Sequence, residues 1–255
     1  MEGDFFCRSF SSAYLYLKLL MNLSQKWHFC LLFLFSPMLS AQEINDIPQV
    51  TDSLYREDQI YFSFTYNIVT GQPTGIRSSQ FSGGFHTGFI RDFPLNERRN
   101  VALGVGLGWS IDTYGQNLYI GKTEDDSATR FLVLDRSRVD FDVNRFTTHS
   151  IDLPIQFRWR TSTPETYKFW RIYGGLRPAY VYYFKSRFEQ AGNTYRESDV
   201  PELERLRLGA TFTFGYNTFN FSFYYSLNSF FKDAMVNDEE LDLKTFQVGL
   251  TFYLL

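Results

Sequence analysis

A chain of 255 residues is long enough for one sizeable domain, and 44% hydrophobic with 21% charged residues excludes an intrinsically disordered protein. The net charge of −3 offers no basic surface and argues against a nucleic-acid partner. Aromatic residues make up 19% of the chain, a heavy share for a soluble domain. Aromatic rings favour strands and the boundary between a bilayer and water, and both uses would explain the excess.

Residues 1–41 have the pattern of a signal peptide. Lys26 precedes an apolar run over residues 29–35, and small residues then lead to a cleavage site that we place between Ala41 and Gln42. The apolar run is too short to span a bilayer as a helix. A buried or peripheral helix is the alternative interpretation of this segment.

Removal of the signal peptide defines a mature chain without cysteine, because Cys7 and Cys30 both precede the proposed cut. Such a chain suits passage through an oxidising compartment. We interpret residues 1–20, ahead of Met21, as a spurious extension from a misplaced start codon. Cleavage removes three basic and two acidic residues, which changes the net charge from −3 to −4. Residues 42–56 are expected to form a periplasmic N-terminal linker.

From residue 59 onward, apolar and polar side chains alternate with period two, which indicates strands with two unlike faces. The predicted strands are 60–68, 81–89, 101–109, 151–159, 172–182, 206–214, 219–227 and 246–254. Their apolar faces carry no charged residue, whereas the opposite faces carry Asp152, Arg158, Arg177 and Arg207. Eight segments of about ten residues predict an all-β fold, a single eight-stranded antiparallel up-and-down transmembrane β-barrel.

The connections between the predicted strands alternate in length. The short ones are 94–100, 161–168 and 217–218, and the longest are 112–148, 190–204 and 232–244. This places all short turns at one end of the barrel and long loops at the other, as in bacterial outer-membrane barrels with external loops and both termini in the periplasm. We therefore expect residues 57–255 to form an outer-membrane barrel domain in contact with outer-membrane lipid.

Period two alone does not say whether the apolar face points to lipid or to the core of a soluble barrel. A secreted lipocalin-like binding barrel also has eight strands and a signal peptide. The apolar face is crowded with Phe, Tyr and Trp, which are too bulky for the inside of an eight-stranded barrel, while the glycine-rich face fits there. A soluble exterior would also carry more Lys and Glu than the polar face shows. Both observations favour the membrane.

The C-terminal strand resembles the signal that the barrel-assembly machinery reads. Gln247, Gly249, Phe252 and Leu254 fill its polar, glycine and apolar positions, although the chain closes on Leu255 and not on an aromatic residue. The resemblance implies that the barrel-assembly machinery is a partner during biogenesis.

Three stretches resemble strands of the PorT-like outer-membrane β-barrel family of Bacteroidota. They are residues 149–158 (HSIDLPIQFR), with an internal proline, 104–109 (GVGLGW) and 173–176 (YGGL). The resemblance covers residues 57–255 and implies an outer-membrane barrel. For a few members it also implies a role in a protein-secretion apparatus.

Two prolines interrupt predicted strands of a barrel that has no free edge. Pro154 and Pro178 each remove a donor from the hydrogen-bond ladder. We expect local β-bulges to accommodate them.

The four inward charges form either a lumen constriction with an ion pathway or a charged core network. In the second interpretation, Asp152 pairs with one of Arg158, Arg177 and Arg207, which makes a buried charge tolerable. The inside of an eight-stranded barrel is just wide enough for side chains to fill, so the core network is favoured.

Catalytic and metal-binding signals are weak. His86 and His149, the two histidines of the mature chain, have no serine and acid partner that spacing reveals, so we predict no enzyme. The acidic runs at 124–126 and 238–242 offer oxygen ligands for calcium, but their spacing matches no EF-hand, and solvated loops are the favoured interpretation. We expect no cofactor and no bound metal.

Three functions stay open. The first is a structural or interaction barrel with envelope protein partners, as a scaffold, an adhesion surface or part of a protein-secretion or envelope-assembly machine. The second is a narrow porin-like channel for small solutes. The third is the soluble secreted binding barrel.

Overall fold

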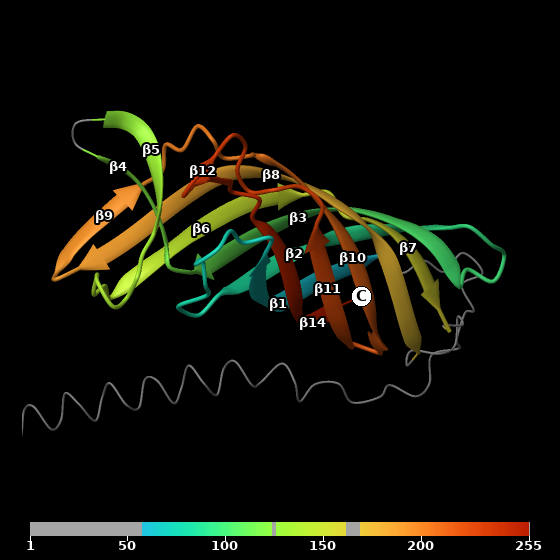
Figure 1. The fold of residues 1–255 in the computed structure, drawn as a ribbon. Helices are drawn as coiled ribbons and strands as arrows, with labels where there is room; N and C mark the ends of the chain where they lie inside the picture. Colours follow the sequence, from blue (N-terminus) through green and yellow to red (C-terminus); the bar gives the residue numbers. More distant parts are fainter. Residues whose placement is uncertain (1–57, 124–125, 162–168, 255) are drawn as a thin grey trace, which may run out of the picture. The chain divides into compact units, whose positions relative to one another are not determined.

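The computed structural model describes residues 58–123, 126–161 and 169–254, and every regular element in these ranges is a β-strand (Figure 1). The predicted signal peptide, its cleavage site at Ala41 and Gln42, and the predicted periplasmic linker lie outside the described residues. No helix within these ranges is long and apolar enough to cross a membrane.

Eight antiparallel strands close into a barrel in the order in which they follow along the chain. They are β1 (Gln59–Thr70), β2 (Gly83–Pro94), β3 (Val101–Gly115), β6 (Val143–Asp152) continued by β7 (Ile155–Arg160), β8 (Trp170–Gln190), β10 (Leu206–Tyr216), β11 (Phe219–Ser226) and β14 (Lys244–Leu254). The two segments β6 and β7 count as one strand because both lie between β3 and β8. The last strand, β14, pairs with β11 and with β1, which closes the barrel. The predicted fold class is confirmed.

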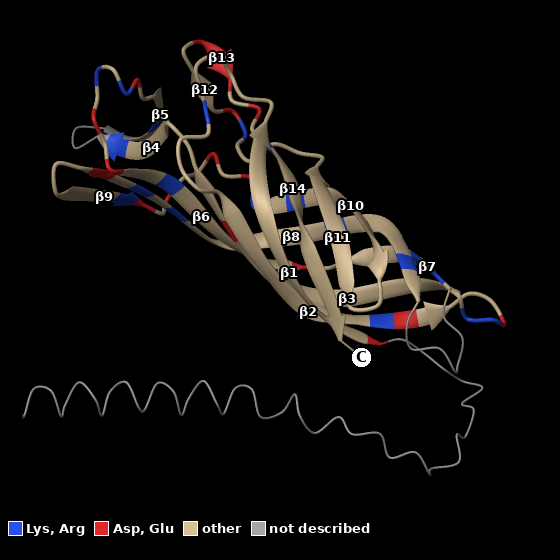
Figure 2. Ribbon diagram, turned by 90° about the horizontal axis from the view of Figure 1, so that it is seen from below, with Lys and Arg blue, Asp and Glu red and all other residues tan. Residues whose placement is uncertain are grey.

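The outward face of the barrel wall is apolar, and the inward face is polar. Leu107, Phe212 and Phe221 on the outward face are 63%, 46% and 53% exposed to the surroundings. Figure 2 shows the middle of the wall almost free of charged residues. Such a continuous apolar surface is far larger than a soluble protein exposes, and it fits the hydrocarbon of a bilayer.

The prolines are accommodated without the expected bulges. Between the two strand segments, the backbone N–H of Leu153 donates to the carbonyl of Pro178 at 2.8 Å, and that of Gly106 donates to the carbonyl of Pro154 at 3.0 Å. Each proline thus loses its own donor but keeps its acceptor in the ladder. The register with β8 is the same on both sides of this break, and the register shift lies instead at His149. The expectation of bulges at the prolines is therefore wrong.

Beyond the barrel, the ends of β3, β6 and β8 continue and carry further strands at the end with the long loops. These are the hairpin of β4 (Leu118–Thr123) and β5 (Asp126–Val133), β9 (Asn193–Glu197), and the hairpin of β12 (Met235–Val236) and β13 (Glu239–Glu240). We call these elements and the strand ends that carry them the external cap. The sequence pattern predicted long connections here, with solvated loops at the acidic runs 124–126 and 238–242, and it did not predict the cap.

The cap has its own hydrophobic core. Phe146 of β6 is 1% exposed, and its ring contacts those of Tyr114, Phe184, Phe230 and Phe231 at centroid distances of 4.8 to 6.2 Å. The other members of the cluster are Ile76, Leu118, Ile120, Phe131, Val181, Val200, Leu203, Ala234, Val236, Leu241 and Leu243. The core explains why long connections fold, because these side chains leave water when the hairpins pack over the barrel mouth.

Candidate functional site

The lumen is closed near the short turns by a buried ion pair. The two oxygens of Asp92 lie 2.6 Å from a guanidinium nitrogen of Arg158 and 2.5 Å from one of Arg160, and all three side chains are 0% exposed. Arg158 also donates to Gln59 and stacks over the ring of Tyr173 at 4.2 Å. One carboxylate therefore lies between two arginines, a geometry that makes burial of these charges tolerable.

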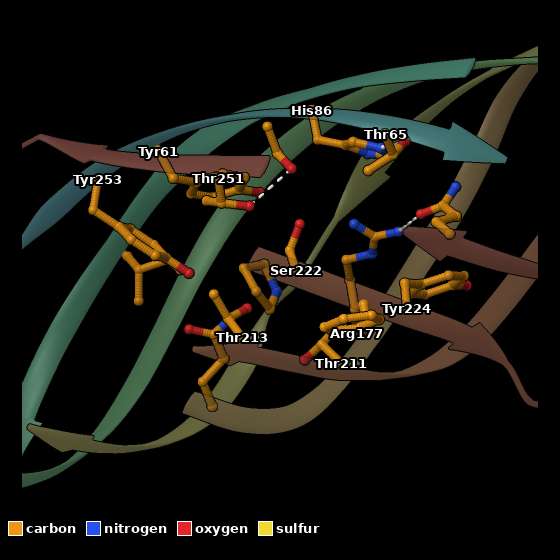
Figure 3. Close-up of a pocket in the computed structure, with 16 residues that line it drawn as sticks. Tyr61, Thr65, His86, Arg177, Thr211, Thr213, Ser222, Tyr224, Thr251 and Tyr253 are labelled. Carbon is orange, nitrogen blue, oxygen red and sulfur yellow. Dashed lines mark hydrogen bonds between the residues drawn. The ribbon is translucent and has the colours of Figure 1, made fainter. Parts of the chain in front are cut away.

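Halfway along the lumen, Arg177 and its neighbours occupy the cross-section of the barrel (Figure 3). The guanidinium donates to Gln247 at 2.9 Å and stacks over the ring of Tyr224 at 4.1 Å. Gln247 in turn donates to Asp112 at 2.9 Å. These contacts lie between two cavities of about 50 and about 30 Å³, both lined by Arg177, Tyr224 and Gln247. Cavities of this size hold a few water molecules and no solute larger than that.

Glycines on the inner wall make room for these large side chains. A Cβ atom added at Gly104 would lie 2.6 Å from Cδ of Arg158, and one added at Gly88 would lie 2.8 Å from the ring of Tyr61. A Cβ at Gly209 would meet the ring of Tyr224. The glycine-rich face is therefore a tightly packed inner wall.

The four inward charges do not join in one network. Asp152 accepts hydrogen bonds from Ser110 and from Ser150, the second at 2.9 Å. Arg207 donates to Ser226 at 2.6 Å. Among the described residues no salt bridge joins Asp152 to an arginine, although Asp152, Arg177 and Arg207 line the same small cavity. The carboxylate that pairs with Arg158 is that of Asp92, which lies three residues beyond the predicted strand 81–89, on the side of the short turn.

The structure brings a serine, a histidine and an acid together, although spacing did not reveal them. Nδ1 of His86 lies 2.8 Å from Oγ of Ser110, and Nε2 lies 3.6 Å from Oδ1 of Asp112. All three are buried in the wall, at 0%, 2% and 7% exposure. The nearby cavities have no room for an acyl substrate. Ser110 also donates to Asp152, so its hydroxyl is part of a packed polar cluster.

The cap closes the lumen at the opposite end. The guanidinium of Arg207 lies 4.0 Å from the ring centroid of Phe230, and Phe230 belongs to the cap core. The same arginine donates to the backbone carbonyl of Ser229. The polar lumen thus ends against an apolar layer.

An open cleft of about 620 Å³ lies on the surface of the cap, and Asn117 ties its walls together. The Asn117 side chain accepts from the backbone N–H of Arg77 at 2.6 Å and donates to the carbonyls of Gly75 and Leu134, each at 3.0 Å. The exposed lining includes Arg77 and Arg136. Because one buried amide holds three segments, the cleft is preformed, and its volume is typical of a site for a small ligand or a peptide side chain.

Charged groups on the cap pair with one another. Lys122 of β4 donates to Asp199 at 2.8 Å, and this hydrogen bond lowers the pKa of Asp199 and raises the pKa of Lys122. In the acidic run at 238–242, Glu239 accepts from the backbone N–H of Thr74. Within the described residues, no cluster of three or more His, Cys, Asp or Glu side chains is arranged to hold a metal ion.

The predicted assembly signal lies on β14. Gln247 points into the lumen, and Gly249 lies so close to β1 that an added Cβ would meet the backbone of Phe64. Phe252 and Leu254 face outward, and the ring of Phe252 packs against that of Phe219 at 5.1 Å. Recognition by the barrel-assembly machinery stays a prediction.

Fold and wall together define a transmembrane β-barrel of the bacterial outer membrane. The sequence model of the family described as outer membrane protein beta-barrel domain matches residues 41–232, and the chain belongs to this family. Comparison with the curated proteins gives no match. A similar solved structure is that of Ail, the attachment invasion locus protein of Yersinia pestis, in complex with the heparin analogue sucrose octasulfate. It is 14% identical, with a TM-score of 0.37 over 79% of this chain and 100% of that chain.

Proposed function

We propose that this protein is a sealed outer-membrane barrel with a structural or interaction role and without enzymatic activity, which presents its external cap to other components of the cell envelope. The observation that carries the proposal is the double closure of the lumen. Buried charges fill it near the turns, and the apolar cap core covers the other end. A barrel with a closed lumen can serve as a scaffold that holds the external cap at the membrane surface.

The cap supports an interaction role because it is folded and preorganised. Its core orders connections that a simple anchor does not need, and Asn117 holds a cleft open towards the exterior. Preorganised surfaces lose less conformational entropy on binding than mobile loops. The resemblance to PorT-like barrels makes a protein-secretion or envelope-assembly machine the partner that we propose.

Conductance in planar bilayers tests whether the lumen is sealed. We expect the purified full chain to be heat-modifiable on gels, as folded barrels are, and to give no current steps. Reproducible single-channel steps that change in an Arg177→Ala variant would overturn the proposal. They would favour the narrow porin-like channel, since Arg177 fills the middle of the lumen.

Complementation in the host bacterium tests the role of the cap. A deletion strain is compared with strains that carry wild type or an Asn117→Ala variant, and the export of secreted proteins is measured. We expect wild type to restore export and the variant to fail at equal outer-membrane abundance, because the cleft loses three hydrogen bonds and the barrel none. Normal export in the deletion strain would exclude the secretion machine as the partner.

A further inference from the structure

Three arginines stand in one row across the outward face of the strands that leave the barrel. Arg145 of β6 is the direct cross-strand partner of Arg187 of β8, and Arg187 is the direct partner of Arg196 of β9. Directly opposed residues share one face of a sheet, about 5 Å apart, and like charges in this arrangement destabilise it. Lys185, one outward position nearer the barrel on β8, adds a fourth positive charge.

Protein carboxylates neutralise this row only in part. Glu189 accepts from Nε of Arg187 at 3.0 Å and from Thr194 at 3.0 Å. In the described part of the chain, no salt bridge joins Arg145, Lys185 or Arg196 to a carboxylate. The sheet therefore holds an excess of positive charge that a bound anion would relieve.

The row lies directly above the aromatic rings that border the lipid-facing wall. On the same outward face, Trp109 donates to the hydroxyl of Tyr182 at 2.7 Å, and His149 packs against Tyr183 at 4.7 Å. Aromatic side chains of this kind mark the interface between hydrocarbon and headgroups. Arg145 is four residues beyond His149, which is about 10 Å of height for a tilted strand and reaches the outer part of the headgroup layer.

We infer that this arginine row binds the phosphate groups of an anionic lipid in the outer leaflet. Guanidinium forks bind phosphate oxygens in pairs, and three in a row suit a headgroup with more than one phosphate. A lipid is favoured over a soluble partner because the row continues the lipid-facing wall on the same strands and the same face. Figure 2 shows that charged residues, basic ones among them, gather on β6 and β9 beyond the middle of the wall, which is almost free of charge. The inference concerns the outside of the barrel and holds whether or not the lumen conducts.

Lipid-dependent thermal stability tests the site with the full chain in neutral detergent. The probe is diphosphorylated lipid A, with the same lipid after phosphate removal for comparison, and the unfolding temperature is read from the heat-modifiable gel shift. We expect the diphosphorylated lipid to raise the unfolding temperature of wild type. The triple variant Arg145→Gln, Arg187→Gln and Arg196→Gln should need roughly 100-fold more lipid for the same shift, at roughly five-fold for each arginine.

Two further variants separate a binding site from a structural role. Arg145→Gln with Arg196→Gln keeps the bond between Arg187 and Glu189, and it should still lose roughly 25-fold in apparent affinity. Without lipid, its unfolding temperature should equal or exceed that of wild type, because like charges have been removed. The matched control for this double variant replaces two basic residues outside both the row and the cleft, Arg138 and Lys232, by glutamine and should respond to lipid A as wild type does.

Two outcomes would overturn the inference. One is an unchanged lipid response in both row variants. The other is an equal stabilisation by soluble tripolyphosphate at the same phosphate concentration, which would make the row a site for soluble polyanions. A current in planar bilayers bears on the sealed lumen and leaves this result unaffected.

Discussion

The barrel and the external cap are built on the same strands with opposite arrangements of polarity. In the barrel part of β8, the outward Leu176 is 46% exposed, and the neighbouring Arg177 points into the lumen. In the cap part, Phe184 and Phe188 point inward, at 2% and 7% exposure, and the charged side chains point outward. The two faces exchange polarity because the surroundings change along the strand from hydrocarbon to polar headgroups and water. The polarity of an outward side chain therefore indicates whether lipid or water surrounds that level of the barrel.

The largest expected effect comes from removing the acid of the buried ion pair. Asp92→Ala removes the carboxylate that Arg158 and Arg160 share, and loss of one partner of a buried pair costs about 3–5 kcal/mol. Denaturant unfolding in lipid vesicles measures the loss. Arg138→Ala, which removes an exposed pair with Asp135, is the control and should change the free energy of unfolding by less than about 1 kcal/mol. An unchanged midpoint for Asp92→Ala would show that the lumen does not need this pair.

The next effect should be confined to the cap. Phe146→Ala removes the ring at the centre of the cap core, and truncation of a buried Phe costs about 3–5 kcal/mol. We expect limited proteolysis to cut the cap while the barrel keeps its heat-modifiable gel shift. Phe81→Ala, at a side chain that is 77% exposed, is the control and should leave the cap resistant. If the barrel unfolds together with the cap in the first variant, the two regions are not separable.

One substitution made on both sides of the boundary sharpens the comparison. Phe212→Arg puts a charge in the middle of the lipid-facing wall, which costs about 2–4 kcal/mol at the bilayer midplane. Leu132→Arg, at a cap side chain of similar exposure (50% against 46%), should cost less than about 0.5 kcal/mol because water surrounds it. Unfolding free energies in the same vesicles compare the two. Equal costs would contradict the assignment of lipid to one region and water to the other.

The smallest effect is the pH dependence of the cap. The hydrogen bond from Lys122 holds the pKa of Asp199 below its usual range, so the stability that this pair contributes is present near neutral pH. It is lost as the pH falls through the lowered pKa and the carboxylate takes up a proton. Near neutral pH, the cap of wild type should resist protease better than the cap of an Asp199→Asn variant. In acid, the two proteins should be equally resistant. A difference in protease resistance that grows as the pH falls would contradict this prediction.

The eight barrel strands could be predicted because each contrasts a lipid-facing side with a lumen-facing side. The cap could not, because Tyr182 and Tyr183 are both exposed where the register shifts, and the alternation of 172–182 does not continue into Phe184. Asp92 and Asp112 were not predicted as inward charges for a simpler reason. They lie on β2 and β3 just past the predicted ends at 89 and 109, and extending the same alternation would have placed both carboxylates inside.

The sequence pattern could not predict which residue each inward charge contacts. Alternation predicts that Asp152 and Arg177 point inward, but it says nothing about the height at which each side chain meets another. That height depends on strand tilt and stagger around the barrel, which only the closed structure defines. Asp152 therefore meets two serines, and Arg177 meets a glutamine from the last strand.

The position of Gln247 on the last strand has a consequence for the order of folding. Its bond to Asp112 spans 135 residues, and the bond from Thr251 to Ser63 spans 188. Neither can form until the final strand has joined the first, so an unfinished barrel keeps its inner charges incompletely bonded. The contacts that Gln247 and Thr251 make therefore form only with closure, whereas the pair of Asp92 with Arg158 joins β2 to β7 and does not depend on the last strand. Until closure, the edges of β1 and β14 also leave backbone N–H and C=O groups unpaired, which is unfavourable in lipid, so closure satisfies the backbone and these lumen side chains together.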